Sequence, residues 1–297
     1  MTVPELSPER GSLRALLARP GLVVAPGAYD VLTARLIERA GFPAVYMTGS
    51  GVSISALGFP DIGLVSLYEV CVRLEQIAGA VGVPVIADAD TGFGNPLNVL
   101  RTVTELERRG AAAIQLEDQD MPKKCGHEPG RTLVPVEEMV AKIEAARAAR
   151  SSAELVIVAR TDARTTHGLA EAIARGRRYA EAGADVIFVE SPETPEEMRA
   201  ICAGIPAPTL ANMVEGGRTP ILDQRALAEI GYKVVIYPNS LTRIMARAGQ
   251  RLLDELKRAG TTTGLAADML THGELWDLFG RREWEQLEAR FVTRKEP

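Results

Sequence analysis

Cysteine, histidine and long apolar segments are scarce in this chain of 297 residues. Its three cysteines, Cys71, Cys125 and Cys202, are widely spaced and accompanied by three histidines, which supports neither a disulfide framework nor a zinc cluster. No uninterrupted apolar segment is long enough to span a bilayer, and the N-terminus has no basic region followed by an apolar core. We therefore expect a cytoplasmic protein.

Positive charge is not in excess either. Lys and Arg number 34 against 39 Asp and Glu, which gives a net charge of -5 and argues against a nucleic-acid or anionic-membrane partner. Hydrophobic residues make up 46% of the chain, enough to form a full core. The length suits two ordinary domains or one large barrel with extensions.

A repeated unit runs through the chain: an amphipathic helix that ends at glycine, then a short apolar segment that ends at a polar residue. The clearest apolar segments are 44–47, 113–116, 186–189 and 234–236. Four more, at 22–25, 83–87, 155–159 and 208–211, bring the predicted strands to eight. The pattern is typical of repeated β-strand and α-helix pairs.

Helices are expected between these strands, over 29–40, 66–81, 136–150, 168–182, 223–230 and 240–259. Asn95-Pro96 is predicted to begin another, and Thr194-Pro195-Glu196-Glu197 is a predicted capping box. Apolar strands that alternate with helices favour an α/β fold, the (β/α)8 TIM barrel, with a doubly wound open sheet as the alternative. We expect a capping helix over 7–19, a barrel domain over 1–260 and a C-terminal helical extension over 261–297.

Acidic residues follow several predicted strands, at the end where barrel enzymes carry their chemistry. Asp88 and Asp90 come directly after the third strand, where two carboxylates repel each other unless a cation neutralises them. Oxygen ligands favour Mg²⁺ or Mn²⁺, with Glu117 as a further, water-mediated partner. Acidic residues after a strand can instead cap the next helix, and for Asp118 and Asp162 this alternative is equally good.

Basic and small residues complete this end of the predicted barrel. Arg160 suits bidentate capture of a substrate carboxylate, or a salt bridge to a neighbouring acid. Thr48-Gly49-Ser50 offers small side chains and backbone N–H groups to an anion. His167 and His272 lie outside this set and are expected to have surface or packing roles.

One cysteine is set apart by its neighbours. Cys125 lies in the loop Lys123-Lys124-Cys125-Gly126-His127, where nearby cations would favour the thiolate. A solvated basic loop with an incidental cysteine is the alternative. Cys71 and Cys202 lie in helical patterns and are expected to pack.

Four segments resemble those of the isocitrate lyase and phosphoenolpyruvate mutase superfamily: residues 88–94, 116–119, 123–127 and 159–163. The resemblance runs from about residue 26 to beyond residue 238. The cysteine loop with Gly126-His127 is similar to the lyase branch, particularly methylisocitrate lyase and 2,3-dimethylmalate lyase, and also to carboxyphosphonoenolpyruvate mutase.

The resemblance implies a TIM barrel, a Mg²⁺ cofactor and a homotetramer whose subunits exchange a C-terminal helix. It implies that Asp88 and Asp90 hold the metal and that Cys125 exchanges a proton, with Lys123 and His127 in the same catalytic set. The substrate-binding residues that it implies are Thr48, Gly49, Ser50, Asp61, Gly126, Arg160, Glu190, Asn212 and Arg243.

Two positions depart from the family pattern. Lys124 stands where an arginine is common, and Val214 stands where methylisocitrate lyases tend to carry threonine, whereas Arg243 matches an arginine of those enzymes. The expected reaction is retro-aldol cleavage of a 2-hydroxy di- or tricarboxylate to a 2-oxo acid and a succinate-like acid. Tyr46 is the candidate base, which requires that local charge lower its pKa. Phosphonate chemistry and oxaloacetate hydrolysis are the alternative activities, and a non-enzymatic binding protein is the alternative of another class.

Overall fold

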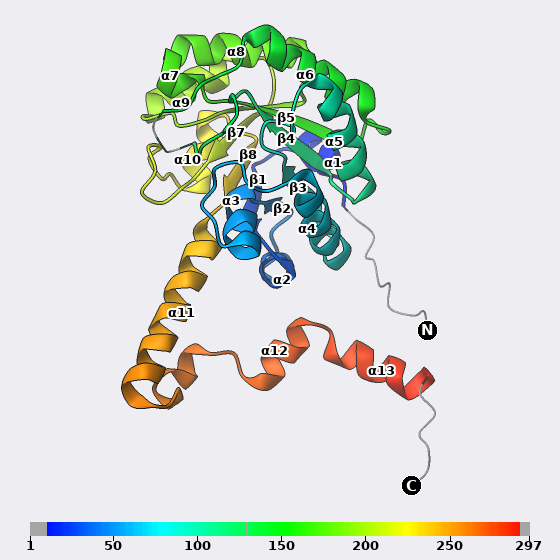
Figure 1. Ribbon diagram of the computed structural model, residues 1–297, viewed down its shortest axis with the longest axis vertical. Coiled ribbons are helices and arrows are strands. Elements are labelled where there is room, and N and C mark those ends of the chain that lie inside the picture. The colour runs from blue at the N-terminus through cyan, green and yellow to red at the C-terminus, as the bar shows by residue number, and fades with distance from the viewer. Residues whose placement is uncertain (1–10, 127, 129, 292–297) are drawn as a thin grey trace.

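The chain forms a closed barrel of eight parallel strands in sequence order (Figure 1). This computed structural model describes residues 11–126, 128 and 130–291. Strand β8 pairs with β1, placing Val235 opposite Val24, so the barrel prediction is confirmed and the open-sheet alternative is wrong. The strands are β1 (Val23–Ala28), β2 (Val45–Met47), β3 (Val85–Asp88), β4 (Ala113–Glu117), β5 (Val156–Thr161), β6 (Val186–Val189), β7 (Thr209–Asn212) and β8 (Val234–Tyr237).

Several strands extend one or two residues further than the apolar pattern predicts. Asp88, Glu117 and Asn212 are the last residues of their strands, and Arg160 lies within β5. Glu117 pairs in register with Arg160, because backbone pairing continues past the point where the side chains become polar. These polar side chains therefore project from the rigid barrel and not from loops.

The expected helices are present, with boundaries within about two residues of the predictions. Asn95 caps α5 through its side chain, as predicted. At α9 the predicted capping box is wrong: Thr194 accepts from Glu197 N, but the Glu197 carboxylate binds Glu193 N and Arg164. The helices of the barrel region are α1 (Leu13–Ala18), α2 (Val31–Arg39), α3 (Gly49–Val52), the π-helix η1 (Ser53–Leu57), α4 (Leu67–Ala80), α5 (Pro96–Arg108), α6 (Val136–Ala149), α7 (Ala163–His167), α8 (Leu169–Glu181), α9 (Pro195–Gly204) and α10 (Gln224–Ile230).

The core has two layers, one inside the barrel and one between the barrel and its helices. Tyr46, Ile86 and Phe188 belong to the inner cluster, and Leu13 of α1 packs against it. The capping helix predicted over 7–19 is therefore present in part, over Leu13–Ala18, while residues 1–10 lie outside the described part. At Gly27 a Cβ atom would lie 2.1 Å from the Pro238 carbonyl oxygen, so β1 and the end of β8 approach too closely for any side chain.

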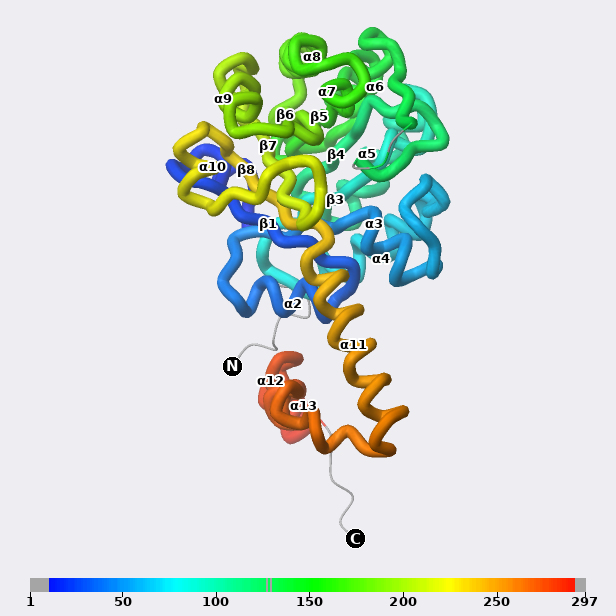
Figure 2. Tube along the Cα trace, turned by 90° about the vertical axis from the view of Figure 1, so that its left-hand side faces the viewer, coloured from blue at the N-terminus to red at the C-terminus, as the bar shows by residue number. Residues whose placement is uncertain are grey.

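The C-terminal segments form an arm that leaves the barrel (Figures 1 and 2). It consists of α11 (Ser240–Ala259), the 3-10 helix η2 (Thr263–Asp268), α12 (His272–Leu278) and α13 (Arg281–Phe291), and none of these elements contains a buried residue. The arm returns to the barrel at α2, where Arg39 Nη2 lies 3.5 Å from Asp277 O. Trp276 and Trp284 are 53% and 58% exposed. Among the described helices, none is both long enough and apolar enough to cross a membrane.

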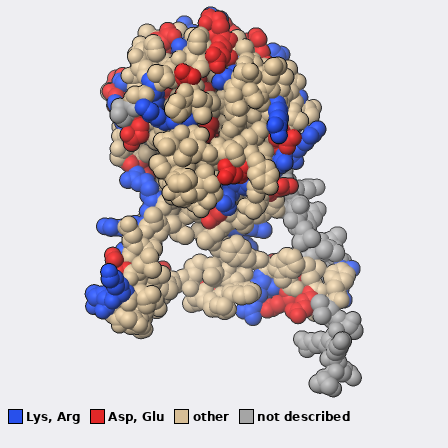
Figure 3. Space-filling model, viewed as in Figure 1, with Lys and Arg blue, Asp and Glu red and all other residues tan. Residues whose placement is uncertain are grey.

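Charged residues of both signs are spread over the barrel face that Figure 3 shows, without a large patch of one sign. The arm in the same view carries stretches of uncharged surface between its charged ends.

Candidate active site

The polar side chains at the strand ends line one small cavity of about 40 Å³ at the mouth of the barrel. Ten predicted site residues line it, and Phe188, Val214, Ile236, Pro238 and Asn239 complete the wall. The predicted ten are Tyr46, Thr48, Ser50, Asp61, Asp88, Cys125, Gly126, Arg160, Glu190 and Asn212.

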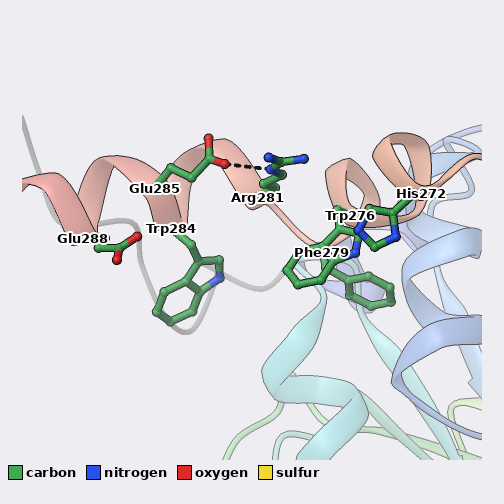
Figure 4. Close-up of a pocket in the computed structure, with 7 residues that line it drawn as sticks. All are labelled: His272, Trp276, Phe279, Arg281, Trp284, Glu285 and Glu288. Atoms are coloured by element: carbon green, nitrogen blue, oxygen red, sulfur yellow. Dashed lines mark hydrogen bonds and ion pairs between the residues drawn. The ribbon is translucent and has the colours of Figure 1, made fainter.

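A larger hollow of about 730 Å³ lies on the arm, between aromatic side chains of α12 and α13 (Figure 4). Trp276, Phe279 and Trp284 point to the same side of these helices in that view. No predicted site residue lines this hollow, so the smaller cavity is the candidate active site.

Asp88 is held in place by three donors at the end of β3. Its Oδ2 accepts from Gly49 N at 3.2 Å, and its Oδ1 accepts from Asp90 N at 3.2 Å and from Gln115 Nε2 at 3.3 Å. Gly49 was predicted to offer its N–H to a substrate anion, but that N–H is directed to Asp88. A Cβ at Gly49 would lie 2.9 Å from the same oxygen, so a side chain at this position would disturb the carboxylate.

Asp90 lies behind the cavity wall with a buried lysine. Lys123 Nζ is 2.6 Å from Asp90 Oδ1 and also contacts Asp61. Its ammonium therefore supplies part of the positive charge that the predicted pair of Asp88 and Asp90 requires. Burial raises the pKa of Asp90 to about 6, with the neighbouring Asp88 and Asp61 charges acting in the same direction and Lys123 opposing them. Burial lowers the pKa of Lys123, but the surrounding carboxylates outweigh it and raise that pKa well above its usual value.

Glu117 is 2% exposed at the end of β4, and burial raises its pKa well above the ordinary value for a glutamate. Its Oε2 is 3.3 Å from Arg160 Nη1, while its buried Oε1 accepts no hydrogen bond from the described residues. The buried Asp90 Oδ1, in contrast, is already bound by the Lys123 ammonium at 2.6 Å. Glu117 therefore offers one buried oxygen that accepts no hydrogen bond from the described residues.

A metal ion that keeps part of its water shell fits this site better than one enclosed by protein ligands. Within the described residues, no three His, Cys, Asp or Glu side chains are grouped closely enough to enclose an ion together. Mg²⁺ commonly binds through one or two carboxylates plus waters and substrate oxygens, so it does not require such a group.

The guanidinium of Arg160 binds acidic side chains of the protein. Its Nε and Nη2 each donate to Asp162 at 2.9 Å, and its guanidinium lies 3.4 Å from Glu190 and 5.1 Å from the centroid of the Phe188 ring. The salt bridge predicted as the alternative role of Arg160 is therefore present. Arg160 also lines the cavity, so capture of a substrate carboxylate stays a prediction.

Asp118 and Asp162 belong to a buried network and do not cap helices through their side chains. Asp162 makes no cap hydrogen bond to α7, because its carboxylate binds Arg160 and Arg131. Burial favours the protonated acid, but these guanidinium groups outweigh it and lower the pKa of Asp162. Asp118 accepts from Thr161, Arg175 and Tyr179 behind the strands.

The cysteine loop covers the cavity. Cys125 and Gly126 both line it, and a Cβ at Gly126 would lie 2.4 Å from Arg160 Nη2, so only glycine permits this approach. The two lysines have partners other than the thiol: Lys123 binds Asp61 and Asp90, and Lys124 Nζ donates to Gly130 O at 2.9 Å. His127 lies outside the described residues.

Two predicted site residues have surroundings that differ from the prediction. The expectation that local charge lowers the pKa of Tyr46 is wrong: burial and then Asp88 raise it well above its usual value, and the hydroxyl donates to Gln115 at 3.1 Å. Arg243 does not line the cavity, because its guanidinium turns outward to Glu215.

Sequence reasoning missed two residues that lie at or beside the cavity. Gln115, which orients Asp88 and Tyr46, could have been identified as a polar residue inside an apolar strand, two positions before Glu117. Asn239 lines the wall directly after Tyr237 and Pro238, so the strand-end rule that identified its neighbours would also have reached it.

Comparison with known proteins identifies the family to which the chain belongs. Residues 13–257 match the family described as Phosphoenolpyruvate phosphomutase. The chain belongs to the phosphoenolpyruvate mutase and isocitrate lyase superfamily. It is 53% identical over 281 residues to 2,3-dimethylmalate lyase of Eubacterium barkeri, covering 95% of this chain and 97% of the relative. It is 46% identical over 283 residues to 2-methylisocitrate lyase of Aeropyrum pernix, covering 95% and 91%.

Solved structures of the superfamily share the complete fold. Oxaloacetate acetylhydrolase with 3,3-difluorooxalacetate superposes with a TM-score of 0.91 at 33% identity, covering 96% of this chain and 97% of that one. Phosphonopyruvate hydrolase with oxalate and Mg²⁺ superposes with a TM-score of 0.85 at 34% identity, covering 95% and 98%. With two lyases among its relatives, this superfamily member is an enzyme of the carbon–carbon lyase kind, similar to methylisocitrate lyase.

Proposed function

We propose that the protein is a Mg²⁺-dependent lyase that cleaves a 2-hydroxy di- or tricarboxylate resembling 2,3-dimethylmalate or methylisocitrate. The observation that carries the proposal is the placement of Cys125 in the same cavity as Asp88, Arg160, Glu190 and Asn212. An acid bound there would meet hydrogen-bonding groups at the barrel mouth and a thiol on the loop that covers it. The 53% identity to 2,3-dimethylmalate lyase over nearly the whole chain supports the same reaction class.

Asp88, Asp90 and Glu117 would hold the metal, directly or through its waters. A bound Mg²⁺ would polarise the oxygens of the 2-oxo acid and neutralise charge that develops on them. The buried Glu117 Oε1, which accepts no hydrogen bond from the described residues, supports this assignment.

Three side chains are proposed to orient the 2-oxo acid half of the substrate. Asn212 Nδ2 donates to Glu190 Oε2 at 3.0 Å, and Arg160 lies 3.4 Å from the same oxygen. This contact fixes the three side chains relative to one another before substrate binds. Thr48, the N-cap of α3, and Ser50 in its first turn also line the cavity and are proposed to bind a substrate carboxylate.

The cleavage requires a proton donor, and the thiol of Cys125 is placed to act as one. The carbon–carbon bond breaks as the substrate hydroxyl releases its proton to water and becomes the 2-oxo group, and the electron pair passes to the departing acid as an enolate. We assign Cys125 as the acid that protonates the enolate carbon. The thiolate that remains once the thiol has given up its proton regains one from water. The atoms balance as pyruvate plus propionate from 2,3-dimethylmalate and as pyruvate plus succinate from methylisocitrate, so the succinate-like product applies to the tricarboxylate.

Tyr46 is proposed as a hydrogen-bond donor to a substrate oxygen, because a raised pKa makes the neutral hydroxyl a poor base. Lys123 is proposed to keep Asp61 and Asp90 in place. The cysteine loop lines this cavity through Cys125 and Gly126, and closure of the loop over a bound substrate would exclude water from the enolate.

A substrate panel tests the proposal. Purified enzyme with Mg²⁺ should release pyruvate from 2,3-dimethylmalate or methylisocitrate, and chelation of the metal should abolish the release. Oxaloacetate hydrolysis is the second candidate activity, favoured by the fold shared with oxaloacetate acetylhydrolase. Phosphonopyruvate is included in the panel to test the alternative of phosphonate chemistry. Turnover of oxaloacetate or phosphonopyruvate without pyruvate release from either hydroxy acid would overturn the lyase proposal.

The arm is proposed as the assembly element of a cytoplasmic homotetramer whose subunits exchange a C-terminal helix. Helix α11 follows the last barrel strand but buries none of its residues, although Ile244, Leu253 and Leu256 are apolar. Together with Trp276 and Trp284 they form more exposed apolar surface than a soluble monomer normally carries. We also propose a barrel domain over 1–260, which includes α11, and a C-terminal helical extension over 261–297.

A further inference from the structure

The loop that carries Cys125 is fixed at its base. Gln119 and Leu133 form an isolated antiparallel bridge there, and Asp120 N donates to Thr132 O at 2.8 Å. The Gln119 side chain also binds the backbone of Lys124 through two hydrogen bonds of 2.9 Å. The position of Gly126, further along the loop, must therefore be set by other contacts.

The Gly126 carbonyl oxygen accepts hydrogen bonds from two side chains outside the loop tip. Arg131, near the base of the loop, donates to it through Nη1, and Ser191, after β6, lies 3.2 Å from it through Oγ. Both residues are buried, with exposed fractions of 7% and 0%. Two buried donors thus converge on one loop carbonyl next to the catalytic thiol.

Arg131 links this carbonyl to the acid that orients Arg160. Its Nη1 also donates to Asp162 at 2.8 Å, and its Nη2 donates to Thr165. Asp162 receives Arg160 at the same time. The Arg131 guanidinium can satisfy this whole set only while Gly126 lies over the cavity, because outward movement of the loop would remove one of its acceptors.

Ser191 has two features that suit a switchable donor. Its φ of 60° is rare for a residue other than glycine, and such strain is often associated with functional positions. Its hydroxyl carries one proton but lies 3.2 Å from both Gly126 O and Glu190 Oε1. It can therefore donate to Gly126 when the loop covers the cavity and to Glu190 when it does not.

We propose that Arg131 and Ser191 are positioning residues that hold the Gly126 carbonyl and thereby place Cys125 over the cavity. They act through the loop backbone and touch no reacting atom. Their kinetic effect rests on the proposed lyase function, whereas their effect on the loop does not.

The loop effect is measured by the rate at which iodoacetamide alkylates Cys125, followed by peptide mass spectrometry. Ser191→Ala and Arg131→Met should each raise this rate about tenfold, the effect of one lost hydrogen bond on a closing equilibrium. Cys71 and Cys202 provide internal references whose rates should not change. Arg164→Met is the matched control, because Arg164 binds Glu193 and Glu197 but not the loop.

A second pair of variants separates the hydroxyl from the backbone strain. Ser191→Gly and Ser191→Ala both lack the hydroxyl, but only glycine relieves the positive φ. A similar rise of the Cys125 alkylation rate in both variants supports the donor role. A rise in Ser191→Gly alone overturns that role for Ser191. If Arg131→Met does not fold, the two Ser191 variants still test the positioning role.

Steady-state kinetics then connects the loop to catalysis. kcat/KM for the cleaved hydroxy acid should fall about tenfold in Ser191→Ala and Arg131→Met, and Arg131→Lys should recover part of the loss. Unchanged alkylation rates in folded variants of both positions would refute the positioning role, whatever the activity. A wild type that cleaves no acid of the panel would refute the proposed function, while the alkylation comparison would still decide the loop contacts.

Discussion

Replacing Asp118 with alanine should destabilise the fold by roughly 3–5 kcal/mol, the range found when one partner of a buried ion pair is removed. Asp118 is 0% exposed and accepts from Tyr179 Oη at 2.8 Å, Thr161 Oγ1 at 2.7 Å and Arg175 Nη1 at 3.0 Å. Without the carboxylate, the Arg175 guanidinium would keep its buried position and lose its buried counter-charge.

Glu171→Ala provides a matched comparison, because it removes the other acid that binds the same arginine. Arg175 Nε lies 3.0 Å from Glu171, but the Glu171 side chain is 39% exposed and water can replace it. Its loss should cost at most about 1 kcal/mol, as for other exposed ion pairs.

Urea unfolding followed by circular dichroism would measure both free energies at one protein concentration, since an oligomer's stability depends on concentration. The free energy of unfolding should fall several times more in Asp118→Ala than in Glu171→Ala. Equal losses would refute the argument that the buried network around Asp118 supports the end of β5, where Arg160 is placed.

Three further predictions concern the site and the arm. Asp88→Ala and Asp90→Ala should each greatly weaken Mg²⁺ binding in calorimetric titration without unfolding the barrel, and unchanged affinity in both variants would remove the metal assignment. Truncation before Gly273 should lower the subunit count measured by light scattering or make the protein insoluble; a soluble chain with the full-length count would show that α12 and α13 are not needed for assembly. Tyr46→Phe should reduce kcat about tenfold, as for one lost hydrogen bond, whereas a loss of about 10⁴-fold would indicate that Tyr46 is the base.

The barrel and most of its cavity wall could be predicted because they follow from local pattern. Each apolar segment ends at a polar residue, and parallel strands bring those ends to one rim. This pattern predicts Asp88, Arg160 and Asn212, and all three line the cavity. Their conformations were harder to predict, since the fork of Arg160 binds Asp162.

Long-range pairing and burial could not be read from the sequence. One partner of Lys123 lies 62 positions away at Asp61, and Arg243 of α11 turns to Glu215 in the segment after β7. The pKa of Tyr46 depends on how completely the barrel excludes water, which composition does not determine. The apolar face of α11 predicts a helix that packs, but the same pattern arises whether its partner is its own barrel or another subunit.

The most direct test of the proposed chemistry compares wild type with Cys125→Ser on 2,3-dimethylmalate and methylisocitrate in the presence of Mg²⁺. Serine keeps the approximate size of the side chain but is a far weaker acid, so pyruvate release should fall by about 10²–10⁴-fold while substrate binding persists. Circular dichroism would establish that the variant is folded. Equal rates of pyruvate release from the two proteins would contradict the assignment of Cys125 as the acid that protonates the departing enolate.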